Sequence, residues 1–381
     1  MMRYSSLEGD EMNNILRWLA VAVDIRQPWK IKHLMRDIIA IVFFASLANA
    51  DDWCSIHLFA VTNEKFLRKY LELPHGIPSH DTIQRVFATV SPDYLQEFRK
   101  RWDQVMSGNT RNRIKKLLGI DGKTQRGNAT STQKANHIVS AVDDRGFCLG
   151  EVLTDEKSNE ITAIPELLRV INIKGHIVTI DAMGCQTAIA ELIKGKRADY
   201  VLALKGNQGT LHEDVKLYFD APELLSGCAY TKTIEKAHSS IERREYWQTE
   251  DISWLSQKKD WKGLKSIAMT KNTITKNDGI TSTEVRYFIS SLPLNVDEIA
   301  WAIRGHWMVE SYHWHLDVTF REDANQTIEK GSAYNLNIMK KMALNTLKLV
   351  DVGIKHKVSL RGKRYVIGWN FEKYFEIIMD I

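Results

Sequence analysis

Apolar side chains recur at helical spacing through the first hundred residues of the chain. Between residues 11 and 107 the hydrophobic positions stand three or four apart, which is typical of helices that bury one face. Ser91-Pro92 supplies an N-cap and a first-turn proline for one of these helices. We therefore predict an all-helical N-terminal domain over residues 1–110. Within it, residues 77–98 fit either a DNA-reading helix-turn-helix or two helices packed in a bundle, and we favour the bundle.

The pattern changes from helical to strand-like spacing at Arg113. Three short apolar runs come first, and a turn over residues 143–146 joins the second and third into a hairpin. The predicted elements are strands 114–121, 137–142 and 147–152, a helix over 160–171, strand 177–181, a helix over 187–194 and strand 200–204. Three antiparallel strands followed by alternating helices and parallel strands is the order of an RNase H-like α/β fold. Parallel strands place ligand sites at their ends, here near Asp181.

Further strand-like runs separate this α/β core from a later helix. Residues 246–248, 264–269 and 285–290 read as short strands, so we predict a β-rich insertion over about 206–294. Three tryptophans in the insertion either offer a stacking surface for a base displaced from duplex DNA or fill a core, which is the commoner role. They are Trp247, Trp254 and Trp261.

Three acidic residues carry the candidate chemistry. Asp121 closes the apolar stretch LLGID, Asp181 closes HIVTID, and Glu310 lies in the helical stretch WAIRGHWMVESYHWHLDV. Taken singly, they fit a turn, a helix cap and a solvated helix face. Taken together, they are what a site for two divalent cations needs, because cations held about 4 Å apart can clamp the attacking and leaving oxygens of a phosphodiester. The set therefore points to cutting and joining of nucleic-acid strands.

The helix around Glu310 presents a polar, titratable face. At about 100° per residue, three further side chains fall within about 60° of Glu310 around the helix. They are His306, His313 and Asp317. Each histidine alone fits a structural role, but the cluster favours a functional face.

Several longer stretches carry a family resemblance. They are IDGKTQRG at 120–127, TDEKSNEITAIPELL at 154–168, TIDAMGCQ at 179–186, ALKGNQ at 203–208 and RGHWMVESYHWHLDVTFREDAN at 304–325. These stretches resemble insertion-sequence DDE transposases, most closely the branch that includes the H-repeat-associated proteins of Rhs elements. The similarity runs from about Asp24 to about Lys348, and the second and last stretches are its most specific parts.

The resemblance implies roles for the three acids. Asp121, Asp181 and Glu310 match the metal-binding DDE triad, in which the two aspartates bridge two Mg²⁺ or Mn²⁺ ions and the glutamate completes one coordination shell. The broader cut-and-paste families carry Tyr-x-x-Arg-x-x-x-Glu-x6-Lys around the glutamate. Here those flanking positions read Ile303, His306 and Asp317, so the phosphate contacts of the missing residues do not transfer.

Polar residues beside the triad are candidate DNA contacts, because the loops that follow two strands can hold a scissile or flanking phosphate. One set follows Asp121, one follows the strand at 200–204, and one precedes Glu310. The candidates are Lys123, Thr124, Arg126, Lys205, Asn207, Gln208, Arg304 and His306.

Composition agrees with this interpretation without proving it. With 381 residues, 44% hydrophobic and 26% charged, the chain is globular and larger than one compact domain. We expect an α/β catalytic domain over 111–350 and a basic C-terminal segment over 351–381. The net charge of +5 permits nucleic-acid binding. Three basic clusters fit phosphate contacts or solvated loops equally well. They are Arg111, Arg113, Lys115 and Lys116; Lys194, Lys196 and Arg197; and Lys355, Lys357, Arg361, Lys363 and Arg364.

Cysteine spacing and hydropathy indicate the compartment. Cys54, Cys148, Cys185 and Cys228 form neither a CxxC nor a zinc pattern, which favours a reduced cytosolic protein. The polar N-terminus does not resemble a signal peptide. The longest apolar run, residues 38–47, is half of the roughly 20 residues that a membrane span requires, so we predict a buried helix there. We expect a cytoplasmic, nucleoid-associated protein that binds no membrane.

These observations favour a transposase that hydrolyses phosphodiesters at element ends and joins the freed 3′-OH to target DNA. Its partners would be double-stranded element ends and target, and paired ends allow a homodimer. Two alternatives stay open. One is a catalytically inactive DNA-binding relative, which the presence of all three acids disfavours, and the other is a metal-dependent nuclease with different substrates.

Overall fold

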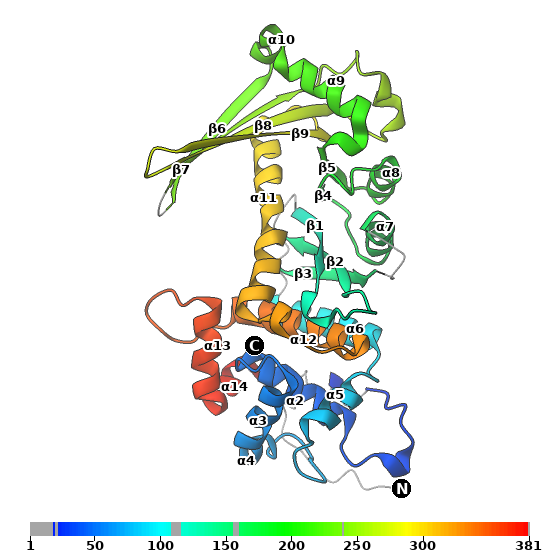
Figure 1. Ribbon diagram of the computed structural model, residues 1–381, viewed down its shortest axis with the longest axis vertical. Helices are drawn as coiled ribbons and strands as arrows, with labels where there is room; N and C mark the ends of the chain where they lie inside the picture. Colours follow the sequence, from blue (N-terminus) through cyan, green and yellow to red (C-terminus); the bar gives the residue numbers. More distant parts are fainter. Residues whose placement is uncertain (1–17, 20–21, 108–115, 155–159, 238–239, 380–381) are drawn as a thin grey trace. The chain divides into compact units, whose positions relative to one another are not determined.

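The computed structural model describes residues 18–19, 22–107, 116–154, 160–237 and 240–379 (Figure 1). The chain forms two compact units. The helical unit comprises residues 1–111, 125–136 and 314–381, and the sheet unit comprises 112–124 and 137–313. No helix of the described residues is long and apolar enough to cross a membrane.

In the helical unit, short helices pack around two mostly buried helices, α2 and α12. Its elements are η1 Pro28–Lys30, α2 Met35–Leu47, α3 Trp53–Thr62, α4 Glu64–Leu67, α5 His80–Phe87, α6 Pro92–Ser107, η2 Arg126–Asn128, the π-helical turn η5 His315–Thr319, η6 Glu322–Ala324, α12 Lys330–Leu349, α13 Leu360–Trp369 and α14 Phe371–Met379. The predicted helical N-terminal region is therefore confirmed. The apolar run 38–47 forms most of α2 and is buried, as predicted.

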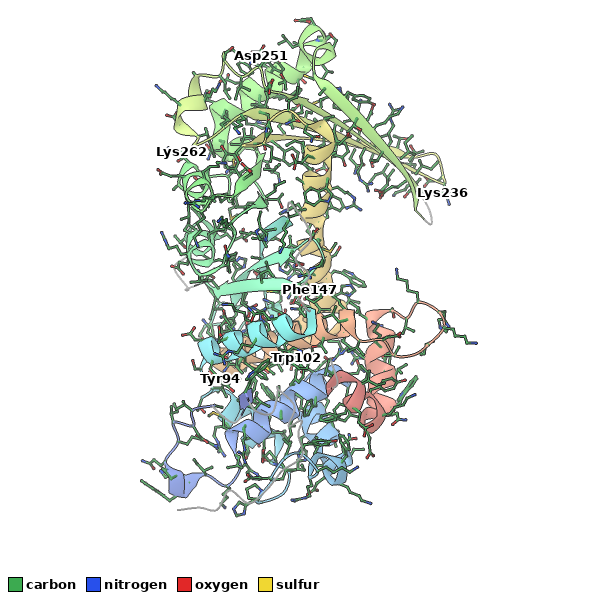
Figure 2. The ribbon with its side chains drawn as sticks, turned by 180° about the vertical axis from the view of Figure 1, so that it is seen from behind. Tyr94, Trp102, Phe147, Lys236, Asp251 and Lys262 are labelled. Carbon is green, nitrogen blue, oxygen red and sulfur yellow. The ribbon has the colours of Figure 1, made fainter. Side chains whose placement is uncertain are left out.

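Helix α6 starts where the sequence predicts and packs within this unit. Pro92 is its first residue, and the Ser91 hydroxyl accepts the Tyr94 N–H at 3.4 Å. Trp102, labelled in Figure 2, is 1% exposed, and its ring N–H donates to the Thr346 hydroxyl of α12 at 2.7 Å. Helices α5 and α6 both contact α12, which is the bundle arrangement favoured for residues 77–98.

The sheet unit is a mixed α/β structure with one nine-stranded sheet. Its elements are β1 Lys116–Thr124, β2 His137–Asp143, β3 Cys148–Leu153, α7 Glu160–Val170, β4 His176–Ile180, α8 Thr187–Gly195, β5 Asp199–Leu204, η3 Gly206–Gln208, α9 Gly209–Asp220, α10 Pro222–Ser226, β6 Ala229–Ala237, β7 Ser240–Thr249, η4 Ser256–Asp260, β8 Ser266–Lys276, β9 Thr281–Ser290 and α11 Val296–Trp314. Every strand and helix predicted between 114 and 204 is present with bounds within three residues.

The strand order is β3-β2-β1-β4-β5-β9-β8-β7-β6. Strands β1, β4 and β5 run parallel, β2 and β3 join them as an antiparallel hairpin, and β9 pairs antiparallel with β5. The predicted β-rich insertion therefore continues the core sheet. The sequence did not predict helix α9 at the start of this segment.

Helices cover both faces of the sheet, with α7 and α8 on one side and α11 on the other (Figure 1). Successive residues of a strand point to opposite faces, so β1 serves both cores. Leu118 and Ile120 pack in the cluster on the α7 face, whereas Leu117 packs in the cluster on the α11 face.

Two glycines let α11 approach β1 closely. A Cβ on Gly119 of β1 would lie 3.3 Å from Cγ1 of Val309, and one on Gly305 of α11 would overlap Cδ2 of Leu117. Because neither position has room for a larger side chain, the helix rests directly on the strand. This contact brings the turn of α11 that carries Glu310 to the part of β1 that carries Asp121.

Candidate carboxylate site of the sheet unit

Asp121 lies on β1 opposite Ser140 of β2, and the strand continues to Thr124. The turn interpretation of Asp121 is therefore wrong. Nδ1 of His313 on α11 lies 3.3 Å from Oδ2 of Asp121. Burial alone would raise the pKa of Asp121, but the hydrogen bond from His313 and the charges of His313 and His306 bring that pKa below its ordinary value.

Asp181 directly follows β4, at the carboxyl end of a parallel strand. Its Oδ1 accepts the backbone N–H groups of Met183 at 3.0 Å and Gly184 at 3.4 Å, which fixes the turn before α8. Burial raises the pKa of Asp181, and the negative charges of Glu160 and Asp121 raise it further. The backbone hydrogen bonds oppose this shift without cancelling it. The end of β4 is thus a place where carboxylates repel one another.

His306 of α11 lies against strand β4. Its Nδ1 lies 3.0 Å from the Thr179 hydroxyl of β4, so the ring is turned toward the sheet. Burial lowers the pKa of His306, and the charges of Asp121, Glu310 and Asp181 act together to raise it. The His306 ring thus lies against β4, the strand that Asp181 directly follows. Glu310 itself is exposed on α11.

The helix face predicted around Glu310 is only partly right. His306 and His313 do turn toward the acidic residues of the sheet, as their bonds to Thr179 and Asp121 indicate. Asp317, however, lies in the π-helical turn η5. A π turn winds more slowly than an α-helix, so the phase of about 100° per residue used to place Asp317 does not apply there.

The donor atoms suit a hard divalent cation, because carboxylate oxygens are the ligands that Mg²⁺ and Mn²⁺ prefer. Their present arrangement does not form a cage. Within the part of the chain that the structure describes, no three His, Cys, Asp or Glu side chains stand in an arrangement that could hold one ion. Asp121 is engaged by His313, and Asp181 by two backbone N–H groups. The carboxylate oxygens are therefore the right type of ligand for such a cation, but the acidic side chains would have to move closer together to bind one ion.

The loop after β5 supports Asp181. The side-chain amide of Asn207 donates to the Ala182 carbonyl at 2.6 Å, and that of Gln208 donates to the Cys185 carbonyl at 2.7 Å. Both bonds hold the segment that follows Asp181, so these two amides are committed to the loop. Lys205, at the start of the same loop, is exposed.

The other candidate DNA contacts are dispersed. Arg304 is exposed, with its guanidinium 5.3 Å from the ring centre of Trp307. His306 is half-buried, and its Nδ1 lies 3.0 Å from the Thr179 hydroxyl. Lys123 is half-buried. Arg126 belongs to the helical unit, where its backbone N–H donates to Asp323.

Thr124 has a partner that the sequence analysis missed. Its hydroxyl lies 2.8 Å from Nδ1 of His137, and Nε2 of the same ring lies 3.0 Å from Oε1 of Glu160. Glu160 stands inside the family-like stretch at 154–168, which was the available signal. His137 lies directly opposite Thr124 in the β1–β2 register, so a correct hairpin register would have placed it.

The three tryptophans of the insertion serve packing. Trp261 is 3% exposed in the core, so it cannot stack on a displaced base. Trp254 stacks on Tyr218 with a 5.1 Å separation of the ring centres, and Trp247 lies against Tyr230. The core-packing alternative is confirmed for Trp261; Trp247 is partly buried against the same core, and Trp254 is 41% exposed.

Some members of two of the three basic clusters are bonded inside the protein, whereas Arg197, Lys355, Lys357 and Arg361 are exposed. Lys194 pairs with Asp199 at 2.7 Å, and Lys196 donates to the carbonyls of Arg169 and Ile171. Lys363 donates to the carbonyls of Leu347 and Val350 at 2.8 and 2.6 Å. Three residues of the first cluster, Arg111, Arg113 and Lys115, lie outside the described residues.

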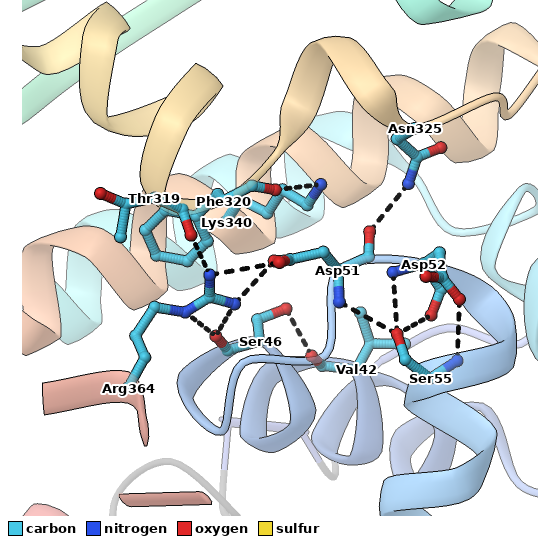
Figure 3. A network of polar contacts seen from close by, with 10 residues as sticks. All are labelled: Val42, Ser46, Asp51, Asp52, Ser55, Thr319, Phe320, Asn325, Lys340 and Arg364. Atoms are coloured by element: carbon cyan, nitrogen blue, oxygen red, sulfur yellow. Dashed lines mark hydrogen bonds and ion pairs between the residues drawn. The ribbon is translucent and has the colours of Figure 1, made fainter. Parts of the chain in front are cut away.

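Arg364 is a structural residue of the helical unit (Figure 3). Its side chain is fully buried, donates to the Ser46 and Thr319 carbonyls, and pairs with Asp51 at 2.6 Å. Its guanidinium also lies 4.0 Å from the ring centre of Phe320. The prediction that Arg364 belongs to a DNA-binding surface is therefore wrong, because a guanidinium with this many buried partners cannot reach a phosphate.

Comparison with known proteins now adds the family. Residues 112–346, more than half of the chain, match the model described as the transposase DDE domain, and residues 16–103 match the model described as DDE_Tnp_1-associated. The chain belongs to the DDE transposase family. It is 38% identical over 358 residues to the "Putative transposase YncI" of Escherichia coli O157:H7, covering 91% of each chain. It is 36% identical to the "H repeat-associated putative transposase YhhI" of Escherichia coli K12, covering 91% of this chain and 94% of that one.

One shorter relative has a name that describes it as inactive. The "Inactive transposase YbfQ" of Escherichia coli K12 is 36% identical over 76 residues, which is 20% of this transposase and 90% of that protein. The resemblance to H-repeat-associated proteins drawn from the sequence is confirmed by these relatives.

Proposed function

We propose that this protein is an RNase H-like DDE transposase that cuts and joins DNA strands at the ends of an insertion element. The observation that carries the proposal is the placement of two of the acids side by side. Asp121 and Asp181 directly follow Ile120 and Ile180, which pair in the parallel β1–β4 ladder. The strand order β3-β2-β1-β4-β5, with β4 and β5 parallel to β1, supports an RNase H-like core. Domain limits of 1–110, 111–350 and 351–381 remain part of the proposal.

Asp121, Asp181 and Glu310 would hold two Mg²⁺ or Mn²⁺ ions. Such ions stabilise the attacking and leaving oxygens of an in-line displacement at phosphorus. Neighbouring residues of the chain orient these carboxylates. The Met183 and Gly184 N–H groups orient Asp181, and Asn207 and Gln208 hold the loop that follows it. The contact with His313 stabilises the charged form of Asp121.

DNA would be positioned by exposed cations around the site. Lys205 and Arg304 are exposed, and Thr124 presents a hydroxyl at the end of β1. Contacts of this kind fix the scissile phosphate without reading sequence. The substrate would be double-stranded element ends and target in the nucleoid, and a homodimer would bring two ends together.

A second function is favoured by two observations. The acids do not form an ion cage within the described residues, and one relative carries the name of an inactive transposase. On those grounds the protein would bind element ends without cutting them. The same experiment separates the two functions.

The decisive variant is Asp181→Asn. Strand cleavage of a duplex that carries the element's own end should fall by several orders of magnitude in Mg²⁺ and in Mn²⁺, because one ion ligand loses its charge. DNA affinity measured in Ca²⁺ should hardly change. Asn keeps the acceptor for the Met183 N–H and removes a charge that Glu160 and Asp121 repel, so the variant should fold at least as stably in chelator. Folded wild-type protein that binds the end tightly but cuts no better than the variant would favour the binding function.

A further inference from the structure

Helix α13 of the helical unit rests on α2 along one stripe of residues. Arg364 is buried and donates to the Ser46 carbonyl of α2 (Figure 3), and Ile367 is 0% exposed. A Cβ on Gly368 would lie 2.8 Å from the carbonyl oxygen of Ala48, which caps α2, so the backbone of α13 approaches α2 directly at this point. These contacts fix the orientation of α13.

A neighbouring stripe of α13 carries one cation and two aromatic rings. Arg361, Tyr365 and Trp369 stand four positions apart, so they follow one another along the helix surface. The Arg361 guanidinium lies 5.7 Å from the Tyr365 ring centre and donates to the Tyr365 hydroxyl at 3.3 Å. The rings of Tyr365 and Trp369 stack with their centres 6.0 Å apart. We call these three side chains the α13 platform.

Trp369 ends the platform with its ring in water. It is 81% exposed, more than any other large apolar side chain of the described residues. A single exposed apolar residue is common on protein surfaces. Two stacked aromatic rings beside a guanidinium are more specific, because rings and guanidinium groups of this kind are the surfaces on which unpaired bases stack.

The charge around the platform is positive. Residues 352–371 contain five Lys and Arg residues and no Asp or Glu. Lys355 and Lys357 of this run are exposed, as is Arg361 of the platform itself. Phosphates of a nucleic-acid strand are attracted to such a surface. The platform therefore complements both parts of a strand, the flat bases and the charged backbone.

We propose that the α13 platform binds single-stranded DNA, with unpaired bases stacked on Trp369 and Tyr365 and a phosphate held by Arg361. The inference rests on the proposed function for the choice of DNA, because a protein that cuts and joins DNA strands meets strand ends. Every base has a π face, so this stacking does not read sequence. Bases inside a duplex are already stacked on one another, and the platform therefore favours unpaired strands.

The measurement compares two fluorescein-labelled DNA strands of equal length and charge. One is an oligothymidylate, and the other is an abasic strand with the same number of phosphates. Anisotropy titrations of the full chain in chelator give both Kd values without metal-dependent cleavage. Wild-type protein should bind the oligothymidylate about fivefold or more tightly than the abasic strand, because only the first can stack.

Two variants of Trp369 test the platform, and Trp29→Ala is the matched control. Trp369→Ala should raise the Kd for the oligothymidylate about fivefold or more and leave the Kd for the abasic strand unchanged. Trp369→Phe keeps an aromatic ring and should retain most of the base-dependent affinity. Trp29 is 78% exposed in the same helical unit, and its loss should change neither Kd. Thermal unfolding recorded in parallel shows that each variant is folded.

Three results would overturn the inference. The first is wild-type protein that binds both strands equally, or Trp369→Ala that binds the oligothymidylate like wild type. The second is an equal loss in Trp29→Ala, which would reduce the effect to exposed rings in general. The third is a loss of self-association by Trp369→Ala in sedimentation velocity with unchanged strand affinity, which would make the platform a contact between two copies of the chain.

Strand cleavage by wild type and Asp181→Asn, recorded separately, distinguishes this inference from the proposed function. If wild type cuts far better than Asp181→Asn while Trp369→Ala binds strands like wild type, the stacking role is wrong and the catalytic site stands. If wild type cuts no better than Asp181→Asn but Trp369→Ala loses the base-dependent affinity, the platform stands and the catalytic proposal is wrong.

Discussion

The two units contain contrasting groups of charged side chains. In the helical unit, Arg364 and Asp51 are buried, face each other at 2.6 Å, and have further partners in the Ser46 and Thr319 carbonyls. In the sheet unit, burial and then the negative charges of Glu160 and Asp121 raise the pKa of Asp181, which has two backbone N–H groups as hydrogen-bond partners. A buried charge with a complete set of partners becomes costly only when one partner is removed, whereas acids near one another repel until a cation neutralises them. The two groups therefore differ in whether a charged side chain has an oppositely charged partner or lies near like charges, and not only in how deeply it is buried.

The largest expected effect on stability comes from breaking the saturated pair. Arg364→Leu leaves Asp51 buried without its guanidinium, so the unfolding free energy should fall by about 3–5 kcal/mol. Denaturant unfolding measures this change. Arg361→Leu, three residues earlier on α13 and exposed, is the control and should cost little. Equal losses of stability in the two variants would show that the buried partners of Arg364 do not matter for stability.

A second prediction concerns the cations near the C-terminus. Lys355 and Lys357 are exposed, whereas the ammonium group of Lys363 is bonded to two backbone carbonyls. Replacing Lys355 and Lys357 by Ala should reduce the slope of log affinity for duplex DNA against log salt by about 0.9 for each phosphate that the protein no longer neutralises. Lys363→Ala should leave the slope unchanged. A titration by fluorescence anisotropy in Ca²⁺ gives the slopes, and the reverse ranking would contradict the comparison.

The smallest effect tests an intermediate case, Asp37 of α2. Its carboxylate is buried and accepts the Leu73 N–H at 2.9 Å, but its nearest cation, Arg36, stands 3.8 Å away. Burial raises the pKa of Asp37 above the ordinary value of 3.8, although the Leu73 N–H and Arg36 oppose the shift. The folded state therefore keeps this proton to a higher pH than the unfolded state. The stability that Asp37 contributes when protonated is lost as pH rises through the raised pKa.

Asp37→Asn keeps the acceptor for the Leu73 N–H and never ionises. The variant should gain unfolding free energy over wild type as pH rises from about 4 to 7, the window that opens at the unfolded pKa. Unfolding by urea at several pH values measures the gap. If the difference in unfolding free energy between Asp37→Asn and wild type were the same at every pH, the prediction would be wrong.

Much of the α/β core was predictable because buried parallel strands are continuous apolar runs. The run 177–181 became β4 at His176–Ile180, and 200–204 became β5 at Asp199–Leu204. The insertion was harder. Strand β6 exposes most of its described side chains, so its sequence lacks the alternation that marks a half-buried strand, and α9 was read as part of a strand-rich segment.

The candidate site divides in the same way. Asp121 and Asp181 were found because each ends an apolar run, and Glu310 because its helix carries a family-like stretch. Glu160 was missed, since its partner His137 stands 23 positions away and only the packing of α7 on β2 joins them. Arg364 was misjudged for the opposite reason. A local run of basic residues suggested a surface, but its acidic partner Asp51 lies 313 positions earlier in the chain.

The sequence by itself determined the family, the helical and α/β regions, and the three acids that chemistry would use, because these follow from local periodicity and residue type. Tertiary structure alone decided which charges are paired. Electrostatic interaction depends on distance and burial, and both are set when β1, β4, α7 and α11 pack together. For that reason two residues far apart in the sequence became a buried ion pair at Arg364 and Asp51, whereas Asp181 came to lie near other acids.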